Sequence, residues 1–205
     1  MKKLSLLLSV ATITCAIFLQ TSCNNTSSVQ QTPEPSKKEL THGEQVERGK
    51  YLVTTTGCND CHSPKKFTPQ GPEIDSAKML SGHPSTMPMP AIDKNSLKPG
   101  NWLLFSPDLT ATVGPWGISY SANITPDTAT GIGSWSEGEF IKTLRTGRHL
   151  GQAGGRQILP PMPWPDFAQA KDEDLKAIFA YLLALPPISN KVPPPVSPIE
   201  ARKLK

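Results

Sequence analysis

Apolar residues recur at the three- and four-residue spacing of an amphipathic helix in three segments of this 205-residue chain. The most regular segment opens on three acidic residues, 172–174, and closes at the proline pair 186–187. The acids suit the positive end of a helix dipole, so the pattern predicts a helix with both ends defined. Its apolar positions share one face: Leu175, Ile178, Phe179, Leu182 and Leu183.

Two further helices are predicted upstream of it. The first covers residues 44 to about 54, and Gly49 within it would permit the close approach of another helix. The second begins after Ser136, which stands three residues before Glu139 in the spacing of a capping box. This helix is expected to end at Gly147.

The segment between the first two predicted helices is long and rich in proline. Nine prolines fall between residues 63 and 120 and leave little room for long regular elements, so an irregular loop is expected there. A loop of this length in a compact domain is normally functional or disordered. A second proline cluster, residues 160–165, is predicted to be extended and not helical.

The first 22 residues have the pattern of an export signal: two lysines, an apolar stretch and then small polar residues. Serines and threonines interrupt the apolar stretch, which is short for a membrane span. The sequence LQTSC ending at Cys23 resembles the lipobox of bacterial lipoproteins, although Gln20 stands where an aliphatic residue is usual. We therefore expect lipidation at Cys23, with simple cleavage of the leader as the alternative.

Polar segments flank the predicted domain on both sides. Residues 23–42 are rich in Ser, Thr, Gln and Pro without apolar periodicity and are expected to form a flexible tether. Residues 191–205 are proline-rich and then basic, which predicts an extended tail. The domain between them would cover residues 43–190.

Charge and residue types exclude several classes of function. The formal net charge is +4 with two of the lysines in the leader, and no basic run occurs, so no nucleic-acid partner is expected. The chain also shows no Ser/His/Asp set, no paired carboxylates and no phosphate-binding loop. A separate catalytic site is therefore not expected.

Cys58 and Cys61 stand three residues apart, and His62 follows directly, which is the attachment pattern of a c-type haem. At this spacing the two thiols lie about one helical turn apart, as the two vinyl groups of one porphyrin require. The adjacent imidazole would be the proximal ligand of the iron. The other two cysteines lie in or at the end of the leader, so one covalently attached haem c and no disulfide are predicted.

Two other uses of this cysteine pair are less consistent with the sequence. A zinc site would need further ligands, because the adjacent Cys61 and His62 cannot comfortably share one tetrahedral ion. A thioredoxin-like redox pair would need a βαβ context, which the flanking sequence does not show.

The ligand on the other side of the iron is left open by the residues alone. Met162 lies between prolines, in a segment stiff enough to hold a thioether at the iron. The other candidates are the loop methionines and two histidines: Met79, Met87, Met89, His83 and His149. An open sixth position is the remaining alternative, in which the haem would bind peroxide or a gas and arginines 145, 148 and 156 would have a polar role.

An ordered set of motifs resembles a known family. The sequences RGKYLV (48–53) and CNDCH (58–62) resemble the opening of class I c-type cytochromes. The segments NITPD (123–127), GIGSWS (131–136), the Pro161–Pro163 segment and 172–187 are similar to a bacterial branch of that family. That branch is similar to single domains of the multihaem cytochrome subunits that serve membrane-bound alcohol and aldehyde dehydrogenases, and the resemblance covers about residues 43–191.

The resemblance implies roles for particular residues. Met162 matches the methionine that ligates the iron, and Pro72 looks like the proline whose carbonyl orients the proximal histidine. The helix around Gly49 would cross the C-terminal helix near Tyr181. Two departures limit the transfer: the stretch from His62 to Met162 is far longer than in small class I cytochromes, and only one CxxCH occurs.

The sequence thus predicts a mostly α-helical cytochrome c-like fold around one covalent haem, with a long irregular insertion. The expected function is one-electron transfer through His62- and Met162-ligated iron, with a haem enzyme or a gas- or peroxide-binding protein as the alternative. Expected partners are a dehydrogenase, an oxidase or another cytochrome. We expect the protein to be exported and held at a bacterial membrane, facing the periplasm, by lipid on Cys23.

Overall fold

The computed structural model describes residues 39–204, which belong to one compact unit that begins at Glu39. Its α-helices are α1 (His42–Thr55), α2 (Cys58–His62), α3 (Glu137–Thr146), α4 (Trp164–Phe167), α5 (Asp172–Leu183) and α6 (Pro198–Ala201). Its strands are β1 (Lys65–Thr68), β2 (Gly71–Ile74), β3 (Leu104–Phe105), β4 (Ala111–Gly114) and β5 (Gly117–Tyr120). Three short 3-10 helices complete it: η1 (Ser76–Lys78), η2 (Lys94–Leu97) and η3 (His149–Gly151).

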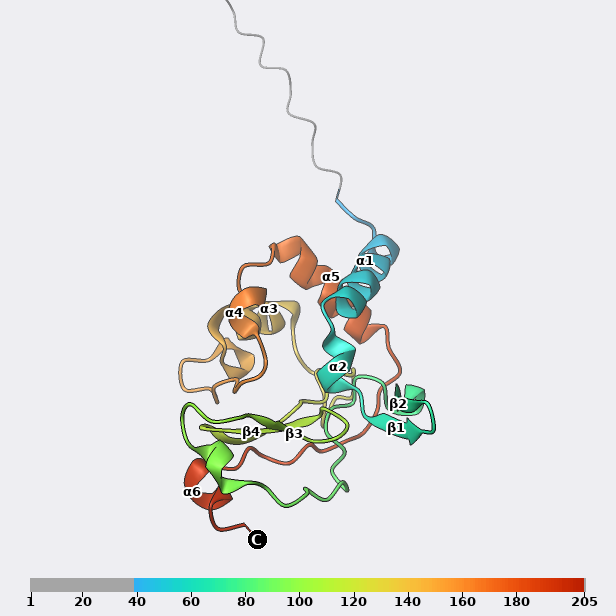
Figure 1. Cartoon of the computed structure of the whole chain (residues 1–205). Coiled ribbons are helices and arrows are strands. Elements are labelled where there is room, and N and C mark those ends of the chain that lie inside the picture. Colours follow the sequence, from blue (N-terminus) through green and yellow to red (C-terminus); the bar gives the residue numbers. More distant parts are fainter. Residues whose placement is uncertain (1–38, 205) are drawn as a thin grey trace, which may run out of the picture. The chain divides into compact units, whose positions relative to one another are not determined.

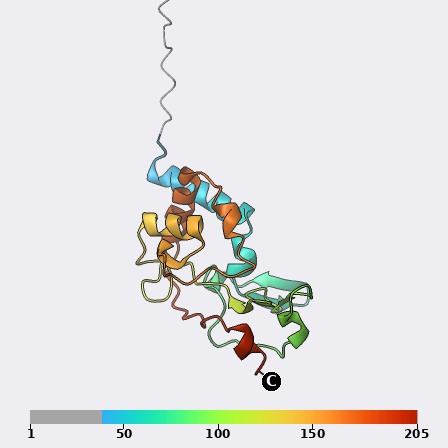
Figure 2. The ribbon, with the colours of Figure 1, turned by 90° about the vertical axis from the view of Figure 1, so that its left-hand side faces the viewer.

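Helices α1 and α5 pack directly against each other, and they remain side by side in both ribbon views (Figures 1 and 2). A Cβ atom on Gly49 would lie 1.9 Å from the Ala177 carbonyl oxygen and 2.7 Å from Cβ of Tyr181, so only glycine permits this contact. An ion pair between Arg48 and Asp174 joins the same two helices. The predicted crossing near Tyr181 is confirmed.

Helix α3 has the ends that the sequence predicts. The Ser136 hydroxyl accepts a hydrogen bond from the Glu139 amide, and the Glu139 carboxylate accepts one from the Ser136 amide at 2.8 Å. Gly147 ends the helix in the left-handed region, with a φ of 64°. The prediction for the proline cluster 160–165 was wrong at its end, because α4 begins at Trp164 with proline in its first turn, where no amide donor is needed.

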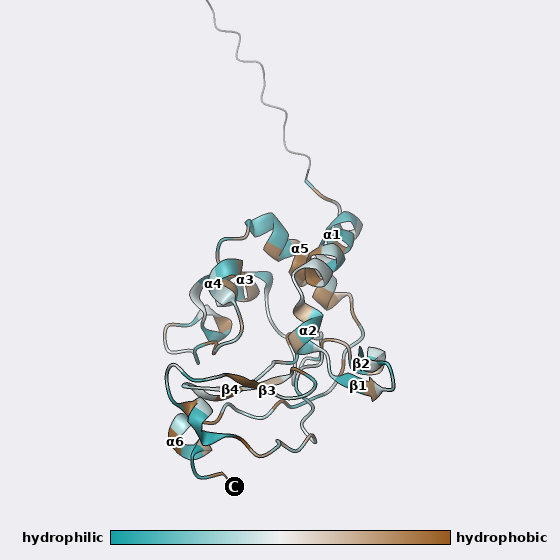
Figure 3. Ribbon diagram, in the orientation of Figure 1, coloured by the Kyte–Doolittle hydropathy of each residue, from teal (hydrophilic) through white to brown (hydrophobic). Residues whose placement is uncertain are grey.

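The main hydrophobic core lies where α1, α3 and α5 meet. Val53, Leu144 and Leu182 contribute from these three helices, and Phe140 packs on Phe179 with ring centroids 5.0 Å apart. Figure 3 shows the hydrophobic residues concentrated on α5 and on β4. The core therefore forms on the apolar faces that the three helical patterns predict.

The region 63–120 has no helix or strand longer than four residues, as its prolines predict, but it contains two sheets that we did not expect. Strands β1 and β2 form an antiparallel hairpin, and β3, β4 and β5 form a second antiparallel sheet in that order. The prolines lie outside the paired positions of β4 and β5, which are free to form a continuous ladder. The prediction of a mostly helical molecule is corrected accordingly: the fold contains both helices and sheets.

The C-terminal tail is also not simply extended. Val196 and Ile118 exchange two backbone hydrogen bonds of 2.9 and 3.0 Å, and α6 follows with Ala201 fully buried. These residues join a second core built on the sheet and η2, with Leu97 and Val113. The compact unit therefore continues past residue 190, the boundary expected for the domain.

The predicted leader, the lipidation candidate Cys23 and most of the predicted tether lie outside the described residues. The last residues of that segment, 39–42, are described, and Thr41 caps α1 by accepting a hydrogen bond from the Glu44 amide. Within residues 39–204, no helix is both long and apolar enough to cross a bilayer.

Candidate haem site

The helix α2 carries all three residues of the CxxCH motif within one and a half turns. Gly57 precedes it with a φ of 71°, a left-handed conformation that lets the chain turn out of α1 into α2. At its other end, the Lys65 ammonium donates hydrogen bonds to the carbonyl oxygens of Asn59 and Asp60. The short helix is therefore fixed at both ends by local geometry.

The two thiols of α2 lie at the edge of the main core. Cys58 is partly buried and packs against the core cluster, and its sulfur lies 3.5 Å from the Thr56 hydroxyl. Burial raises the pKa of both Cys58 and Cys61 above the usual range of a thiol. Spaced three residues apart on one helix, the two sulfurs lie on the same side of it.

His62 is held by two neighbouring segments. Its main-chain carbonyl accepts a hydrogen bond from the Gly82 amide at 2.8 Å, and its ring Nδ1 lies 2.8 Å from the Ala122 carbonyl oxygen. A carbonyl can only accept, so Nδ1 carries the proton and Nε2 keeps its lone pair. Burial lowers the pKa of His62, which favours the same neutral imidazole.

The residue that orients His62 is not the one that we expected. Pro72 lies in β2, opposite Phe67 in the hairpin, and the His62 ring contacts the Ala122 carbonyl oxygen instead. Gly82 makes this possible, since a Cβ atom on it would lie 2.5 Å from the Ala122 carbonyl carbon. A main-chain acceptor 60 residues away has no signature in the sequence, so inspection of the motifs could not have found it.

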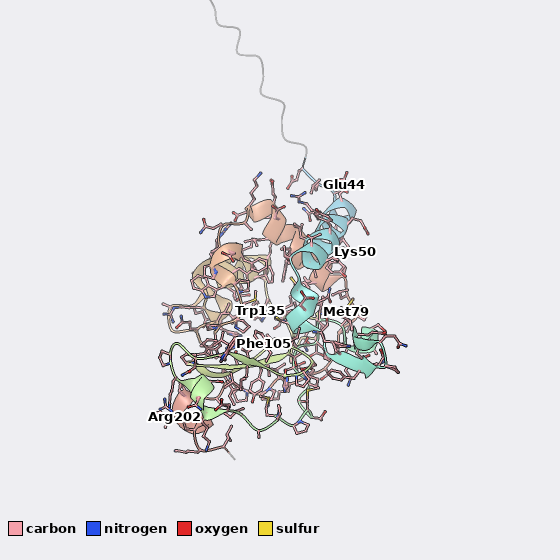
Figure 4. All side chains as sticks on the ribbon, viewed as in Figure 1. Glu44, Lys50, Met79, Phe105, Trp135 and Arg202 are labelled. Atoms are coloured by element: carbon pink, nitrogen blue, oxygen red, sulfur yellow. The ribbon has the colours of Figure 1, made fainter. Side chains whose placement is uncertain are left out.

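The candidate methionines fall into separate environments. Met162 and Met79 both pack against the main core, as Cys58 does, and in Figure 4 Met79 and Trp135 lie on either side of α2. Met79 also lines a cavity of about 300 Å³ at the C-terminal end of α5. Met87 and Met89 line a different cavity, whose wall includes Phe67 of β1, and do not join the main core.

The Met162 segment is attached to the sheet. The Ser119 hydroxyl donates a 2.6 Å hydrogen bond to the Pro160 carbonyl oxygen, and the Trp116 indole nitrogen donates to the same hydroxyl at 3.3 Å. Ser119 lies in β5, three residues before Ala122. One stretch of chain, 119–122, thus contacts both the Met162 segment and the ring of His62.

The two candidate histidines have other surroundings. The ring of His83 is buried and bonded through Nδ1 to the Thr110 hydroxyl at 2.8 Å. His149 lies edge-on to Trp135, with ring centroids 5.3 Å apart, and burial lowers its pKa, with a further contribution from Arg156. His149 thus reaches the main core through Trp135, which packs against it.

Two of the arginines considered for a distal pocket are engaged elsewhere. Arg145 donates to the Ala168 carbonyl oxygen and pairs with Asp172, which ties α3 to the start of α5. Arg148 donates to the Gly155 carbonyl oxygen at 3.2 Å. These contacts close local loops and orient both guanidinium groups toward structural partners.

The donor set fits a covalently attached haem. Two thiols stand three residues apart on α2, the neighbouring imidazole has a free Nε2, and a thioether packs against the same core as Cys58. Such a combination of cysteine attachment and histidine ligation defines the c-type cytochrome class.

Comparison with known proteins leads to the same class. The gluconate 2-dehydrogenase cytochrome c subunit of Pantoea cypripedii is 32% identical over 138 residues, which are 67% of this chain and 22% of that protein. The alcohol dehydrogenase (quinone) cytochrome c subunit of Gluconobacter oxydans (strain 621H) is 37% identical over 91 residues, 43% of this chain and 18% of that protein. The fructose dehydrogenase cytochrome subunit of Gluconobacter japonicus is 26% identical over 157 residues, 77% of this chain and 24% of that protein.

No family model matches the chain. Its similarity to dehydrogenase cytochrome subunits confirms the resemblance drawn from the motifs, and a cytochrome-like fold follows from it. The chain spans less than a quarter of the length of these relatives.

Proposed function

We propose that this protein is a one-electron carrier with a single haem c attached through Cys58 and Cys61. His62 would be the proximal ligand and Met162 the ligand on the opposite side. Bound haem supplies an iron that cycles between the ferrous and ferric states, and a thioether ligand favours the ferrous one. The relatives are named as cytochrome subunits of dehydrogenases, which supports electron transfer rather than substrate chemistry.

The observation that carries this proposal is the state of the His62 ring. Its Nδ1 donates a hydrogen bond to the Ala122 carbonyl oxygen, which fixes the ring orientation. The lone pair of the neutral Nε2 then remains available to bind the iron. Metal-ligating histidines characteristically give their second ring nitrogen to such an acceptor.

Met162 is preferred over the other methionines for two reasons. It packs against the core that Cys58 also contacts, and the Ser119 hydrogen bond to Pro160 restrains its segment. Proline on both sides limits the backbone angles available to it, which keeps the thioether in place without a helix. The alternative with an open sixth position is less well supported, because Arg145 and Arg148 have structural partners.

The visible spectrum of the ferric protein tests this assignment. We expect a low-spin spectrum with the weak far-red band of thioether ligation, and Met162→Ala should become high-spin with a lower reduction potential. Met79→Ala is the matched control, because Met79 packs against the same core, and it should leave the spectrum unchanged. A Met162→Ala variant with the wild-type spectrum would contradict the proposal, and a high-spin wild type would favour ligand binding.

We further propose that the protein is exported, faces the periplasm and is anchored to a bacterial membrane by lipid on Cys23. Because its relatives are named as cytochrome subunits of dehydrogenases, a dehydrogenase is the redox partner that we favour. Detergent-phase partitioning tests the anchor: Cys23→Ser should move the protein to the aqueous phase, and a variant that stays in the detergent phase would refute lipidation.

A further inference from the structure

A second cavity, of about 380 Å³, shares no lining residue with the candidate haem site. It is lined by His83 and by two methionines, Met87 and Met89. Ser106 and Asp108, at the start and end of a short turn, also line it. Most of its remaining wall is proline and Phe67, so the lining is largely apolar. Met87 and Met89 are half-buried, which gives the cavity access to solvent.

A hydrogen-bonded chain fixes the protonation of His83. The Thr110 hydroxyl donates its one proton to Oδ2 of Asp108 at 2.7 Å. It can therefore only accept from His83, so the proton of the imidazole is on Nδ1 and the lone pair is on Nε2. Burial lowers the pKa of His83, against opposing effects of Asp108 and of the Met87 backbone, which favours the neutral ring.

The Nε2 atom of His83 is the unusual feature of this cavity. The side chain is 1% exposed, and Nε2 is the buried side-chain polar atom within residues 39–204 that lacks a hydrogen-bond partner. Buried polar atoms in native proteins nearly always have a partner, and an exception calls for an explanation such as a bound ion. His83 lines this cavity together with Met87 and Met89, each of which carries a thioether.

We propose that His83 Nε2 and the thioethers of Met87 and Met89 form a binding site for a soft monovalent metal ion, Cu(I). Thioethers select Cu(I), and imidazole is compatible with it. The Thr110–Asp108 chain behind the ring is the outer support that metal-ligating histidines require. This site rests on the proposal that Met162, and not His83, Met87 or Met89, is the sixth ligand of the haem iron.

A hard cation fits this cavity less well. Oδ1 of Asp108 accepts from the Ser106 hydroxyl at 2.7 Å and from the Thr110 amide at 3.2 Å, and Oδ2 accepts from the Thr110 hydroxyl. Both oxygens of the Asp108 carboxylate thus already accept hydrogen bonds from residues of the same turn. Within residues 39–204, no group of three or more His, Cys, Asp and Glu side chains could hold a metal ion.

Anaerobic titration with Cu(I) against bicinchoninate, a chromogenic Cu(I) chelator, tests the proposal. The haem-loaded full chain is used with Cys15→Ser and Cys23→Ser, and a thiol count of zero verifies that no cysteine competes for copper. We expect one Cu(I) to be retained per chain, with an X-ray absorption spectrum that shows nitrogen and two sulfur ligands. The haem spectrum should not change.

The variants keep the volume of the cavity and remove its donors. Met87→Leu combined with Met89→Leu should weaken Cu(I) binding by at least about 10-fold, and Thr110→Val by about 10- to 100-fold through loss of the outer support. Met79→Leu, which lies outside this cavity, is the control and should bind as the wild type does. No retention of Cu(I), retention by the double variant, or preferential retention of Zn(II) would each overturn the assignment, and the methionines would then only fill the cavity.

Discussion

Ser119 shows how one hydroxyl group supports the candidate site from a distance. It is 9% exposed, accepts from Trp116 and donates to the Pro160 carbonyl oxygen, two residues before Met162. Removing the hydroxyl leaves both partners in a partly buried place without their hydrogen bonds. The cost of such an unmade bond is about 1–3 kcal/mol.

Ser119→Ala should therefore loosen the Met162 segment without removing an iron ligand. We expect the ferric haem protein to bind added imidazole several-fold more tightly, because the thioether competes less well for the iron. Titration followed in the visible spectrum measures this affinity. Thr54→Ala is the control, since that hydroxyl donates to a carbonyl within α1 and is exposed. An equal change in both variants would show that Ser119 has no specific role.

Asp127 gives a pH dependence with a definite sign. Hydrogen bonds from the Thr130 hydroxyl and amide, and from the Ala129 amide, hold the pKa of Asp127 below its ordinary value of 3.8. The ionised carboxylate therefore stabilises the fold above pH 3.8, and this contribution is lost as the pH falls through the lower folded-state pKa.

Asp127→Asn should be less stable than the wild type at neutral pH and should lose less stability between pH 5 and pH 2. Denaturant unfolding at a series of pH values measures both effects. Asp93→Asn is the comparison, because the Asp93 carboxylate caps η2 and accepts one hydrogen bond, from the Asn95 amide. If the acid dependence of Asp127→Asn matched that of the wild type, the carboxylate would not be a source of it.

At the scale of the elements, the contact between α1 and α5 depends on a single missing side chain. Gly49→Ala would place a Cβ atom 1.9 Å from the Ala177 carbonyl oxygen, so the two helices must separate. Overpacking of this kind costs about 1–3 kcal/mol or more, and we expect at least that loss in the free energy of unfolding. Gly43→Ala, in the same helix with nothing within 4 Å, should be neutral or stabilise by up to about 1 kcal/mol. Equal effects of the two substitutions would refute the contact.

The helices could be predicted because their information is local. Capping residues, apolar spacing and terminal glycine or proline lie within each segment, so α1, α3 and α5 were expected nearly as they are. The strands could not be predicted in the same way. All four residues of β4 are buried, so its sequence ATVG does not alternate between polar and apolar positions.

In the candidate site, too, the local features could be predicted from the sequence and the long-range contacts could not. The residues of α2 are recognised by spacing alone, because their chemistry requires adjacent positions. The acceptor for His62 is a backbone atom of Ala122, and the restraint on Met162 comes from Ser119, 41 residues from the proline that it contacts. Contacts between distant segments depend on the fold, and nothing in a single sequence marks them.

At the scale of the whole molecule, the C-terminal segment completes the second core. Leu97, Val113 and Ile118 pack with Ala201, which α6 inserts between the sheet and η2. Gly117 lies under this segment with a φ of 99°, and a Cβ atom there would lie 2.0 Å from the Val196 carbonyl oxygen. The proline-rich sequence gives no helical or strand pattern at this place, which is why an extended tail was expected.

A truncation before Val196 should therefore destabilise the sheet, although it removes residues far from α2. Two backbone hydrogen bonds to Ile118 and the burial of Ala201 are lost, and we expect the free energy of unfolding to fall by about 2 kcal/mol or more. The Ile118 amide, which donates to Val196 at 2.9 Å, should exchange with solvent much faster. Truncation after Arg202 removes no residue of this core and should change neither quantity. If both truncations left Ile118 protected, the strand would be held by its own sheet, and the C-terminal segment would be dispensable for the fold.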